Sequence, residues 1–572
     1  MFELNLSEEE LKKRTDKTYL LTKTMISSEH ESYKNLSDGD KEALLHLLKA
    51  GKILEDVYLR QDNEKNKDFK KFLEDETAKG NELARLSLIL FNAQKGMSAI
   101  DRESNMVYLA KGETSSDGKG FYPSDLTKEE FHTILIKMLK EGKTGEVKNI
   151  LTQRSMVVRD GEYLKGIDYT EFFKDEFSKA ADELEIAAKT STNKDFNEYL
   201  TLQANALRNN DPMLDAYADK KWAELQEDAV LEFTISREQY ADMLTGTVIE
   251  NEELKKLLED NGIEPLSKDS IGIRIGIINK KGTENLLKIK KYIPMLAGYM
   301  PFKEEYEQNI TEGDDKQTMV DVDLAALYGD EGAYRGGITV AQNLPNNDKL
   351  SLTIGGGRRN VYHRQIREIK DKDKLQKRLD ATLDKSLHKY FDAEASHKFT
   401  IGHENVHSLG PKNGTEALGK YKNIIEENKA DMGSMAFLDI LVKEGMYTEE
   451  EKKQIIVTFC AGNFMKSEPP ISQAHRVRSV MQTKYFLDHG AVSVDENGLI
   501  HVDMDKVVPT AMKMLEEIVR IQIDRDFNKA EDYINRNFVW TDEMERVAKK
   551  LRTTDLELNG RVEYPLADEL LK

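Results

Sequence analysis

Residues 403–407, His-Glu-Asn-Val-His, place two histidines four positions apart, with a glutamate directly after the first. On a helix, positions i and i+4 lie one above the other on the same face. His403 and His407 can therefore direct two imidazole nitrogens at one point. Glu404 lies beside them, where it can reach a water at the metal rather than the metal itself. This arrangement is typical of a zinc-dependent hydrolase.

A second acidic segment, Glu426-Glu427-x-x-x-Asp431, follows about twenty residues later on a stretch that also reads as helical. Glu427 is the obvious supplier of a third ligand. Two histidines and one glutamate, with a fourth position left to water, form a catalytic rather than a structural zinc set. The alternative is a surface helix with two solvated histidines, and the downstream acidic segment argues against it.

Composition limits the classes of protein to consider. The 572 residues are 33% charged and 39% hydrophobic, which is typical of a soluble globular protein with two or three lobes. A net charge of −20 argues against a nucleic-acid partner, which needs a basic surface. The single cysteine, Cys460, excludes a disulfide framework within the chain and favours a reducing compartment.

The start of the chain has no apolar segment typical of a signal peptide, although a chain trimmed of its leader would look the same. No uncharged apolar run reaches the length of a transmembrane helix. We therefore expect a cytoplasmic protein without a membrane partner. The oligomeric state cannot be predicted from the sequence.

Apolar periodicity predicts a helix-rich chain with a modest β element in its middle. Strands are expected at 229–240, 270–279 and 336–341, with turn-rich residues after the last of these. The glycine-rich residues 355–360 lack the Lys-Ser/Thr of a phosphate-binding loop, so a connecting loop is expected there. An Asp-Gly pair predicts a hairpin within 155–164. Helices are expected at 38–54, 81–93, 129–142, 169–207, 374–393, 423–443, 449–462, 472–489 and 507–523, besides the histidine helix.

Five motifs occur together in this chain. They are HENVH at 403–407, EENKAD at 426–431, QNLPNND at 342–348, EFTISREQY at 232–240 and ISQAHRVRS at 471–479. As a set they resemble the dipeptidyl peptidase III family of zinc exopeptidases, especially its divergent branch. Members of the family typically have three residues between His-Glu and the second histidine. Here only two intervene, which keeps the i,i+4 relation on a helix.

The resemblance implies a single bound zinc ion. His403 and His407 match the family's two histidine ligands, and Glu427 matches its carboxylate ligand. Glu404 matches the catalytic glutamate. The residues expected to support the ligands are Asp431, where the family usually has a glutamate, and Glu426, which is placed to contact a ligand histidine.

The resemblance also implies a substrate pocket. Glu238 matches a glutamate that holds the free amino group of the substrate, and Tyr240 matches a tyrosine that faces the scissile carbonyl. Asn343 and Asn346 match asparagines of the same amine pocket. His475 matches a histidine that helps to stabilise the transition state. Arg478 does not align with the family's arginine.

These residue types suit their implied roles. An ammonium group has three donors and no acceptor, so a carboxylate and two amide oxygens satisfy it. Tyr240 and His475 are suitable donors to an oxyanion.

Each of these residues also has a simpler structural interpretation. Asn343 and Asn346 bracket a proline and fit a turn. Glu238 and Tyr240 fit a surface pair on one strand, and His475 fits a structural histidine.

The resemblance implies an α+β fold of two lobes separated by a wide cleft. A lower lobe of residues 1–289 and 328–372 is expected to have a small β-barrel core and the amine pocket. An upper, mainly helical lobe of residues 290–327 and 373–572 is expected to bind zinc. The predicted function is release of dipeptides from the free N-terminus of short peptides, with Glu404 activating the water. The alternatives are a zinc hydrolase of a non-peptide amide or ester, and a non-catalytic helical scaffold.

Overall fold

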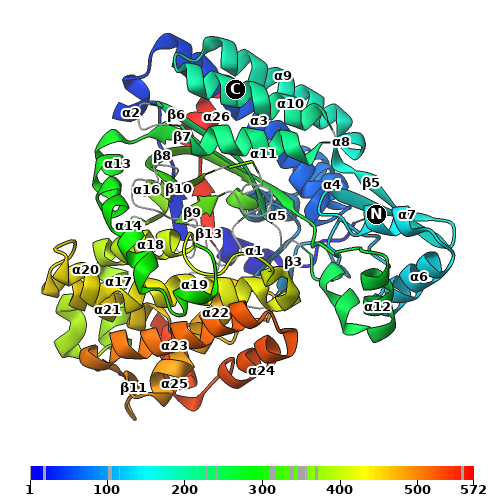
Figure 1. The fold of residues 1–572 in the computed structure, drawn as a ribbon. Helices are drawn as coiled ribbons and strands as arrows, with labels where there is room; N and C mark the ends of the chain where they lie inside the picture. The colour runs from blue at the N-terminus through cyan, green and yellow to red at the C-terminus, as the bar shows by residue number, and fades with distance from the viewer. Residues whose placement is uncertain are drawn as a thin grey trace.

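The structure, a computed structural model, is helix-rich and contains one five-stranded sheet (Figure 1). This agrees with the predicted α+β class. The described residues are 2–16, 21–100, 106–114, 116–209, 211–225, 229–238, 242–308, 317–333, 340–344, 354–355, 357–367, 372–554 and 560–572.

The sheet has the strand order β6-β7-β8-β10-β9. β10 runs parallel to β8, and the other neighbouring pairs are antiparallel. Within the described residues the sheet is curled but open, so the small β-barrel core that was expected is present as a half-barrel. The strands are β6 (Leu231–Glu238), β7 (Ser270–Ile278), β8 (Gln317–Gly329), β9 (Ala341–Leu344) and β10 (Arg358–His363).

Strand β8 lies in the middle of the sheet and was not predicted. Asp321 and Asp323 alternate with the apolar residues Val320, Val322 and Leu324 as on a strand with one exposed face, although both aspartates are fully buried. Asp323 accepts hydrogen bonds from Ser32 Oγ at 2.6 Å and from the amides of Asn279 and Gln365 at 3.0 Å each. Polar partners distant in sequence therefore make a buried carboxylate tolerable at a position that reads as exposed.

Two further boundaries differ from the sequence expectations. Residues 358–360 of the expected glycine-rich loop begin β10. Most of the strand expected at 336–341 lies outside the described residues, and β9 instead continues through Gln342–Leu344, which were expected to form a turn. The predicted boundary between residues 327 and 328 falls inside β8, whose earlier residues pair with β7 and β10. The division into two lobes stays a prediction.

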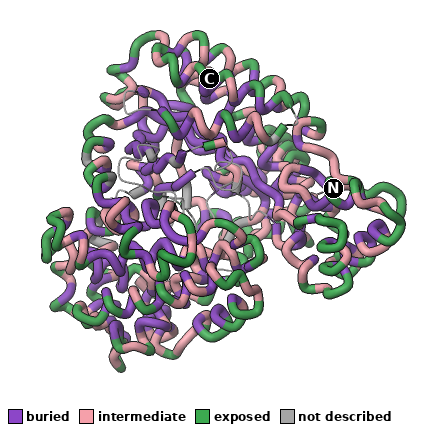
Figure 2. Tube along the Cα trace, viewed as in Figure 1, coloured by how far each residue is buried: buried purple, intermediate pink, exposed green. Residues whose placement is uncertain are grey.

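The first large hydrophobic core lies between the sheet and the helices α3 (Asp38–Asp62), α9 (Lys174–Thr190) and α10 (Lys194–Arg208), as Figures 1 and 2 show. α3 begins at an N-cap serine, Ser37, whose hydroxyl accepts from Asp40 N. α3 packs close to the sheet because Gly51 has no side chain: a Cβ there would lie 2.6 Å from the Tyr328 ring.

The second large core is built by the C-terminal helices, drawn in yellow to orange in Figure 1. Its main helices are α18 (Ala393–Val406), α19 (Lys422–Ala436), α21 (Glu449–Gly462), α22 (Ala474–Asp488) and α23 (Met504–Asp524). A smaller third core joins α1, α4 and α5 near the N-terminus. The other helices of eight or more residues are α1 (Glu8–Thr15), α4 (Asn66–Ala78), α5 (Glu82–Gln94), α6 (Lys128–Lys140), α11 (Pro212–Ala223), α12 (Glu252–Asp260), α17 (Lys372–Thr382), α24 (Phe527–Asn537) and α25 (Asp542–Thr554).

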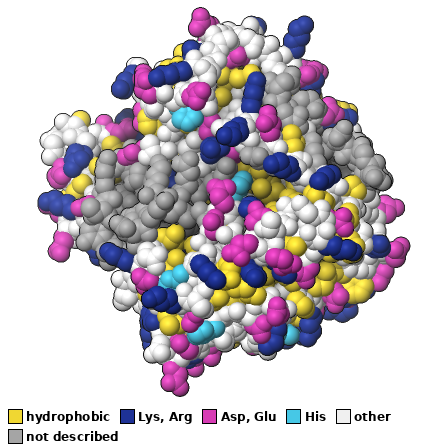
Figure 3. Space-filling view, turned by 90° about the vertical axis from the view of Figure 1, so that its left-hand side faces the viewer, with side chains coloured by type: hydrophobic (Ala, Val, Ile, Leu, Met, Phe, Trp, Pro, Cys, Tyr) yellow, Lys and Arg dark blue, Asp and Glu magenta, His cyan; other side chains and the backbone are white. Residues whose placement is uncertain are grey.

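The hairpin expected near residue 160 is confirmed as β4 (Ser155–Asp160) and β5 (Tyr163–Asp168). Thr127 caps α6, because its hydroxyl accepts a hydrogen bond from Glu130 N at 3.2 Å. Acidic and basic side chains are interspersed over the face in Figure 3. Among the described residues, every helix is too short or too polar to cross a membrane. The cytoplasmic location stays a prediction.

Helices α18 and α19 approach closely at two glycines. A Cβ on Gly402 would lie 2.3 Å from Ser434 Oγ, and a Cβ on Gly433 would lie 2.5 Å from Val406 Cγ1. The valine is branched at Cβ and fixed in the last turn of α18, so it has little freedom to move away. The two helices can therefore pack at this distance only with glycine at 433.

We expect Gly433→Ala to lower the free energy of unfolding by up to about 2 kcal/mol. Overpacking a tight contact costs about 1–3 kcal/mol, and alanine recovers about 1 kcal/mol of helix propensity. The matched control is Gly462→Ala in α21, where no atom lies within 4 Å of the added Cβ. That variant is expected to be neutral or stabilising. Denaturant unfolding measures both, and equal behaviour of the two variants would contradict the close-packing argument.

Candidate active site

The two histidines of the motif lie at the end of α18. Asp392 caps the start of this helix by accepting from Glu394 N at 2.6 Å and Ala395 N at 3.3 Å. The helix ends at Val406, but His407 keeps helical torsion angles of φ −55° and ψ −29°. The i,i+4 relation therefore persists to His407, and the two imidazole rings lie 4.6 Å apart between centroids.

His403, His407 and Glu427 form a group whose ligand atoms all lie within 4.8 Å of one another. The two Nε2 atoms are 3.1 Å apart. Oxygens of Glu427 lie 3.6 Å from His403 Nε2 and 3.9 Å from His407 Nε2. Two nitrogens bound tetrahedrally to one zinc lie about 3.3 Å apart, so the separations fit a zinc ion.

Each histidine uses its other nitrogen to contact a carboxylate. His403 Nδ1 lies 2.7 Å from Asp431 Oδ1, and His407 Nδ1 lies 3.0 Å from Glu426 Oε1. If both Nδ1 atoms carry the proton, both Nε2 lone pairs face each other at 3.1 Å, which is repulsive unless a cation lies between them. The arrangement thus prepares both imidazoles to bind a metal.

Cationic side chains hold the two supporting carboxylates. Arg478 pairs with Asp431, and Gln482 Nε2 donates to Asp431 Oδ2 at 3.0 Å. Lys429 Nζ lies 2.8 Å from Glu426 Oε1. Burial opposes ionisation of both carboxyls, but these cations and the histidines outweigh it and lower both pKa values. Both carboxylates therefore stay charged and can accept from the imidazoles.

Sequence reasoning gave no role to Arg478, Gln482 or Lys429. A signal was nevertheless present: His475, Arg478 and Gln482 recur at spacings of three and four, so they share one face of α22. What the sequence could not give is the neighbour of that face, which is α19.

Glu404 lies in the cavity wall beside His403. It is 5% exposed, and burial is the main cause that raises its pKa to about 7, against the lowering effect of His403. A carboxyl with a pKa near neutrality is suited to take and return protons. Burial also lowers the pKa of His407 to about 4, which keeps its imidazole neutral.

His475 contacts the metal group directly. Its Nδ1 lies 3.0 Å from Glu427 Oε2, and its side chain is about half exposed to the cavity. This contact lowers the pKa of Glu427 although burial opposes it. The structure therefore places His475 beside the predicted ligand, and its role towards the transition state stays a prediction.

The amine-pocket residues are only partly described. Glu238 is the last residue of β6, and the structure describes only its backbone. Asn343 is buried in β9, and its Nδ2 lies 3.5 Å from Ser408 Oγ, one residue beyond His407. The sheet edge thus reaches the end of the histidine helix. Tyr240 and Asn346 lie outside the described residues.

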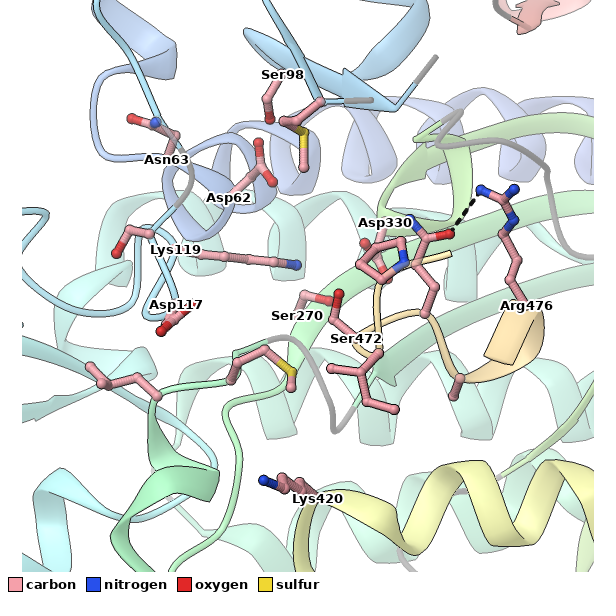
Figure 4. A pocket seen from close by; sticks show the side chains of 18 of the residues that line it. Asp62, Asn63, Ser98, Asp117, Lys119, Ser270, Asp330, Lys420, Ser472 and Arg476 are labelled. Carbon is pink, nitrogen blue, oxygen red and sulfur yellow. Dashed lines mark hydrogen bonds between the residues drawn. The ribbon is translucent and has the colours of Figure 1, made fainter. Parts of the chain in front are cut away.

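A cavity of about 1350 Å³ joins residues of both large cores (Figure 4). Ser270, at the start of β7, and Asp330 lie on one wall in that view, and Ser472 and Arg476 come from the segment before α22 and from its first turn. His403, Glu404 and His475 line the same cavity. A molecule in it can therefore contact the start of β7 and the metal group together.

No protein-family model matches the chain. A curated relative, Nudix hydrolase 3 of Arabidopsis thaliana, is 23% identical over 94% of this chain and 72% of its own length. More than a quarter of that protein lies outside the alignment. The activity in its name is stated for that protein alone.

Two solved structures are similar over nearly the whole chain. Dipeptidyl peptidase III from Caldithrix abyssi has a TM-score of 0.76 at 24% identity, covering 99% of this chain and 100% of that one. The enzyme from Corallococcus sp. strain EGB has a TM-score of 0.80 at 24% identity, covering 98% of each chain. This chain therefore has the fold of these dipeptidyl peptidase III structures, the fold that the resemblance of its motifs implied.

Proposed function

We propose that this protein is a zinc-dependent metallopeptidase that releases dipeptides from the free N-terminus of short peptides. The observation that carries the proposal is the His403, His407 and Glu427 group beside a buried Glu404 in the wall of a large cavity. The dipeptidyl peptidase III fold supports the choice of a peptide substrate.

His403, His407 and Glu427 would hold the zinc ion, and Asp431 and Glu426 would orient the two imidazoles. A zinc ion with an open position acts as a Lewis acid, polarising a carbonyl and lowering the pKa of water to about 7. The three side chains leave room for that open position because they supply only three ligands.

Glu404 would act as the general base. Its carboxylate removes a proton from the water that attacks the amide carbon and then delivers that proton to the leaving nitrogen. Glu404 and His403 both line the large cavity, from which the substrate would approach. Tyr240 and His475 would donate hydrogen bonds to the oxyanion that develops on the attacked carbonyl.

The amine pocket would lie at the sheet, with Glu238, Asn343 and Asn346 holding the substrate ammonium. Because Asn343 lies next to Ser408, the pocket and the metal group would be close enough to fix where the chain is cut. The sheet and the C-terminal helices would form the two lobes of a cleft, as the two cores suggest, and substrate binding would favour their closure.

Replacing the proposed base should abolish hydrolysis without removing the metal. We expect Glu404→Gln to lower kcat for a dipeptidyl arylamide by about 100- to 10,000-fold, the usual contribution of a general base. Zinc content, measured by elemental analysis, should stay at one per chain. His403→Ala, by contrast, should lose both zinc and activity. If neither variant changes metal content or activity, the chain is a scaffold with an incidental motif.

Blocking the substrate amine should prevent cleavage. We expect N-acetylation of a short peptide to lower kcat/KM at least about a hundredfold, because several hydrogen bonds to a charged ammonium are lost and each contributes about 1.5–3 kcal/mol. Mass spectrometry of the products gives both the rate and the size of the released fragment. Equal cleavage of blocked and free peptides would exclude dipeptide release. Hydrolysis of esters or other amides alone would indicate a non-peptide substrate.

A further inference from the structure

Ser270 is a buried residue with an unused hydroxyl. It begins β7, is 2% exposed and lines the large cavity, where Figure 4 shows it. Among the residues that the structure describes, no group hydrogen-bonds its Oγ atom. Buried hydroxyls are nearly always hydrogen-bonded, because an unpaired one forfeits its interactions with water. A hydroxyl in a cavity wall without a protein partner is available to a ligand bound in the cavity.

The sheet register places Ser270 beside the proposed amine pocket. Ser270 is the partner of Glu238 in the β6–β7 ladder, and the two paired positions share one face of the sheet. The next pair on that face is Ser236 with Gly272. Ser270 is therefore the position on the neighbouring strand that lies nearest to the residue expected to hold the ammonium.

The same face of the sheet has a carboxylate, Glu331, and the buried guanidinium of Arg274, which are linked through the side chain of Gln342. Glu331 lies over Gly272, where an added Cβ would be 2.6 Å from Glu331 Cγ. One oxygen of Glu331 accepts from Ser236 Oγ at 2.6 Å and from Gln342 Nε2 at 2.5 Å. Among the described residues, its other oxygen is buried without a donor. A carboxylate with a vacant acceptor position stabilises a positive charge bound near this end of the cavity.

We propose that Ser270 Oγ accepts a hydrogen bond from the free ammonium group of the substrate, which makes Ser270 a specificity-determining residue. The proposal rests on the proposed function and deepens it. An ammonium has three N–H donors, and a hydroxyl oxygen offers two lone pairs. Ser270 thus adds an acceptor to the carboxylate and amide groups of the pocket. It distinguishes a primary ammonium, with all three donors, from an N-terminus that has lost them.

This role and a structural role predict opposite effects on stability. If Ser270 Oγ has no partner in the free protein, Ser270→Ala removes a desolvated hydroxyl and leaves the melting temperature unchanged or higher. If the hydroxyl supports the fold, the melting temperature falls. Thermal unfolding of the ligand-free protein separates the two, and a decrease comparable with that of the control below would overturn the proposal.

Binding tests the ammonium contact without requiring hydrolysis. The probes are the dipeptide dialanine and propionyl-alanine, which has the same skeleton without the amino group. We expect Ser270→Ala to raise the Kd of dialanine about tenfold or more, as loss of a hydrogen bond to a charged group requires, and to leave the Kd of propionyl-alanine unchanged. Calorimetric titration of the zinc-loaded protein measures all four values.

Ser236→Ala is the matched control because it makes the same change on the same face of the sheet. The Ser236 hydroxyl already donates to Glu331, so its loss should lower the melting temperature and leave the discrimination between the two probes intact. If Ser270→Ala weakens both probes equally, or wild type binds both alike or neither, Ser270 does not recognise an ammonium. If one of these results is found with a protein that hydrolyses peptides, the proposed function stands and the role of Ser270 is excluded. If the wild type binds dialanine selectively and Ser270→Ala abolishes that selectivity, but no peptide is cleaved, the role of Ser270 stands and the proposed function is excluded.

Discussion

The arrangement on which the site depends is the fixing of two imidazoles by two carboxylates. His403 and His407 each present Nδ1 to a carboxylate, and this turns both Nε2 atoms to one point, 3.1 Å apart. Left alone, two facing lone pairs would drive the rings apart. The carboxylates prevent this because Arg478 and Lys429 keep them charged and in place. The fold thus holds the two Nε2 lone pairs in a repulsive arrangement, and a bound cation would attract both of them.

This arrangement requires α18 and α19 to pack very closely. The end of α18 supplies the histidines, and α19 supplies both supporting carboxylates and the proposed third ligand. The contacts of Gly402 with Ser434 and of Gly433 with Val406 give that proximity. Side chains of ordinary size at these positions would separate the helices and lengthen every distance between imidazole and carboxylate. The two glycines therefore have a functional consequence, although neither is placed to touch metal or substrate.

The metal half of the site could be predicted because it depends on local geometry. The i,i+4 spacing of His403 and His407 and the i,i+4 spacing of Glu427 and Asp431 each follow from helix periodicity alone. The sheet could be predicted less well. In β8, the burial of Asp321 and Asp323 could not be predicted, because their partners come from distant parts of the chain. Arg478 was missed for a similar reason: both helices were predicted, but the sequence does not show that its helix, α22, packs against α19.

The sheet and α18, the helix that carries His403, are in direct contact. This contact connects the two sides of the cavity. Tyr362 of β10 packs edge-on against His397 of α18, with ring centroids 5.6 Å apart, and Asn343 of β9 reaches Ser408. We therefore expect a ligand that shifts β9 to act on Ser408, the residue beside His407. Conversely, a metal that fixes His407 steadies the end of α18 on which β9 rests. Because such coupling is reciprocal, order at the metal group and order at the edge of the sheet should favour each other.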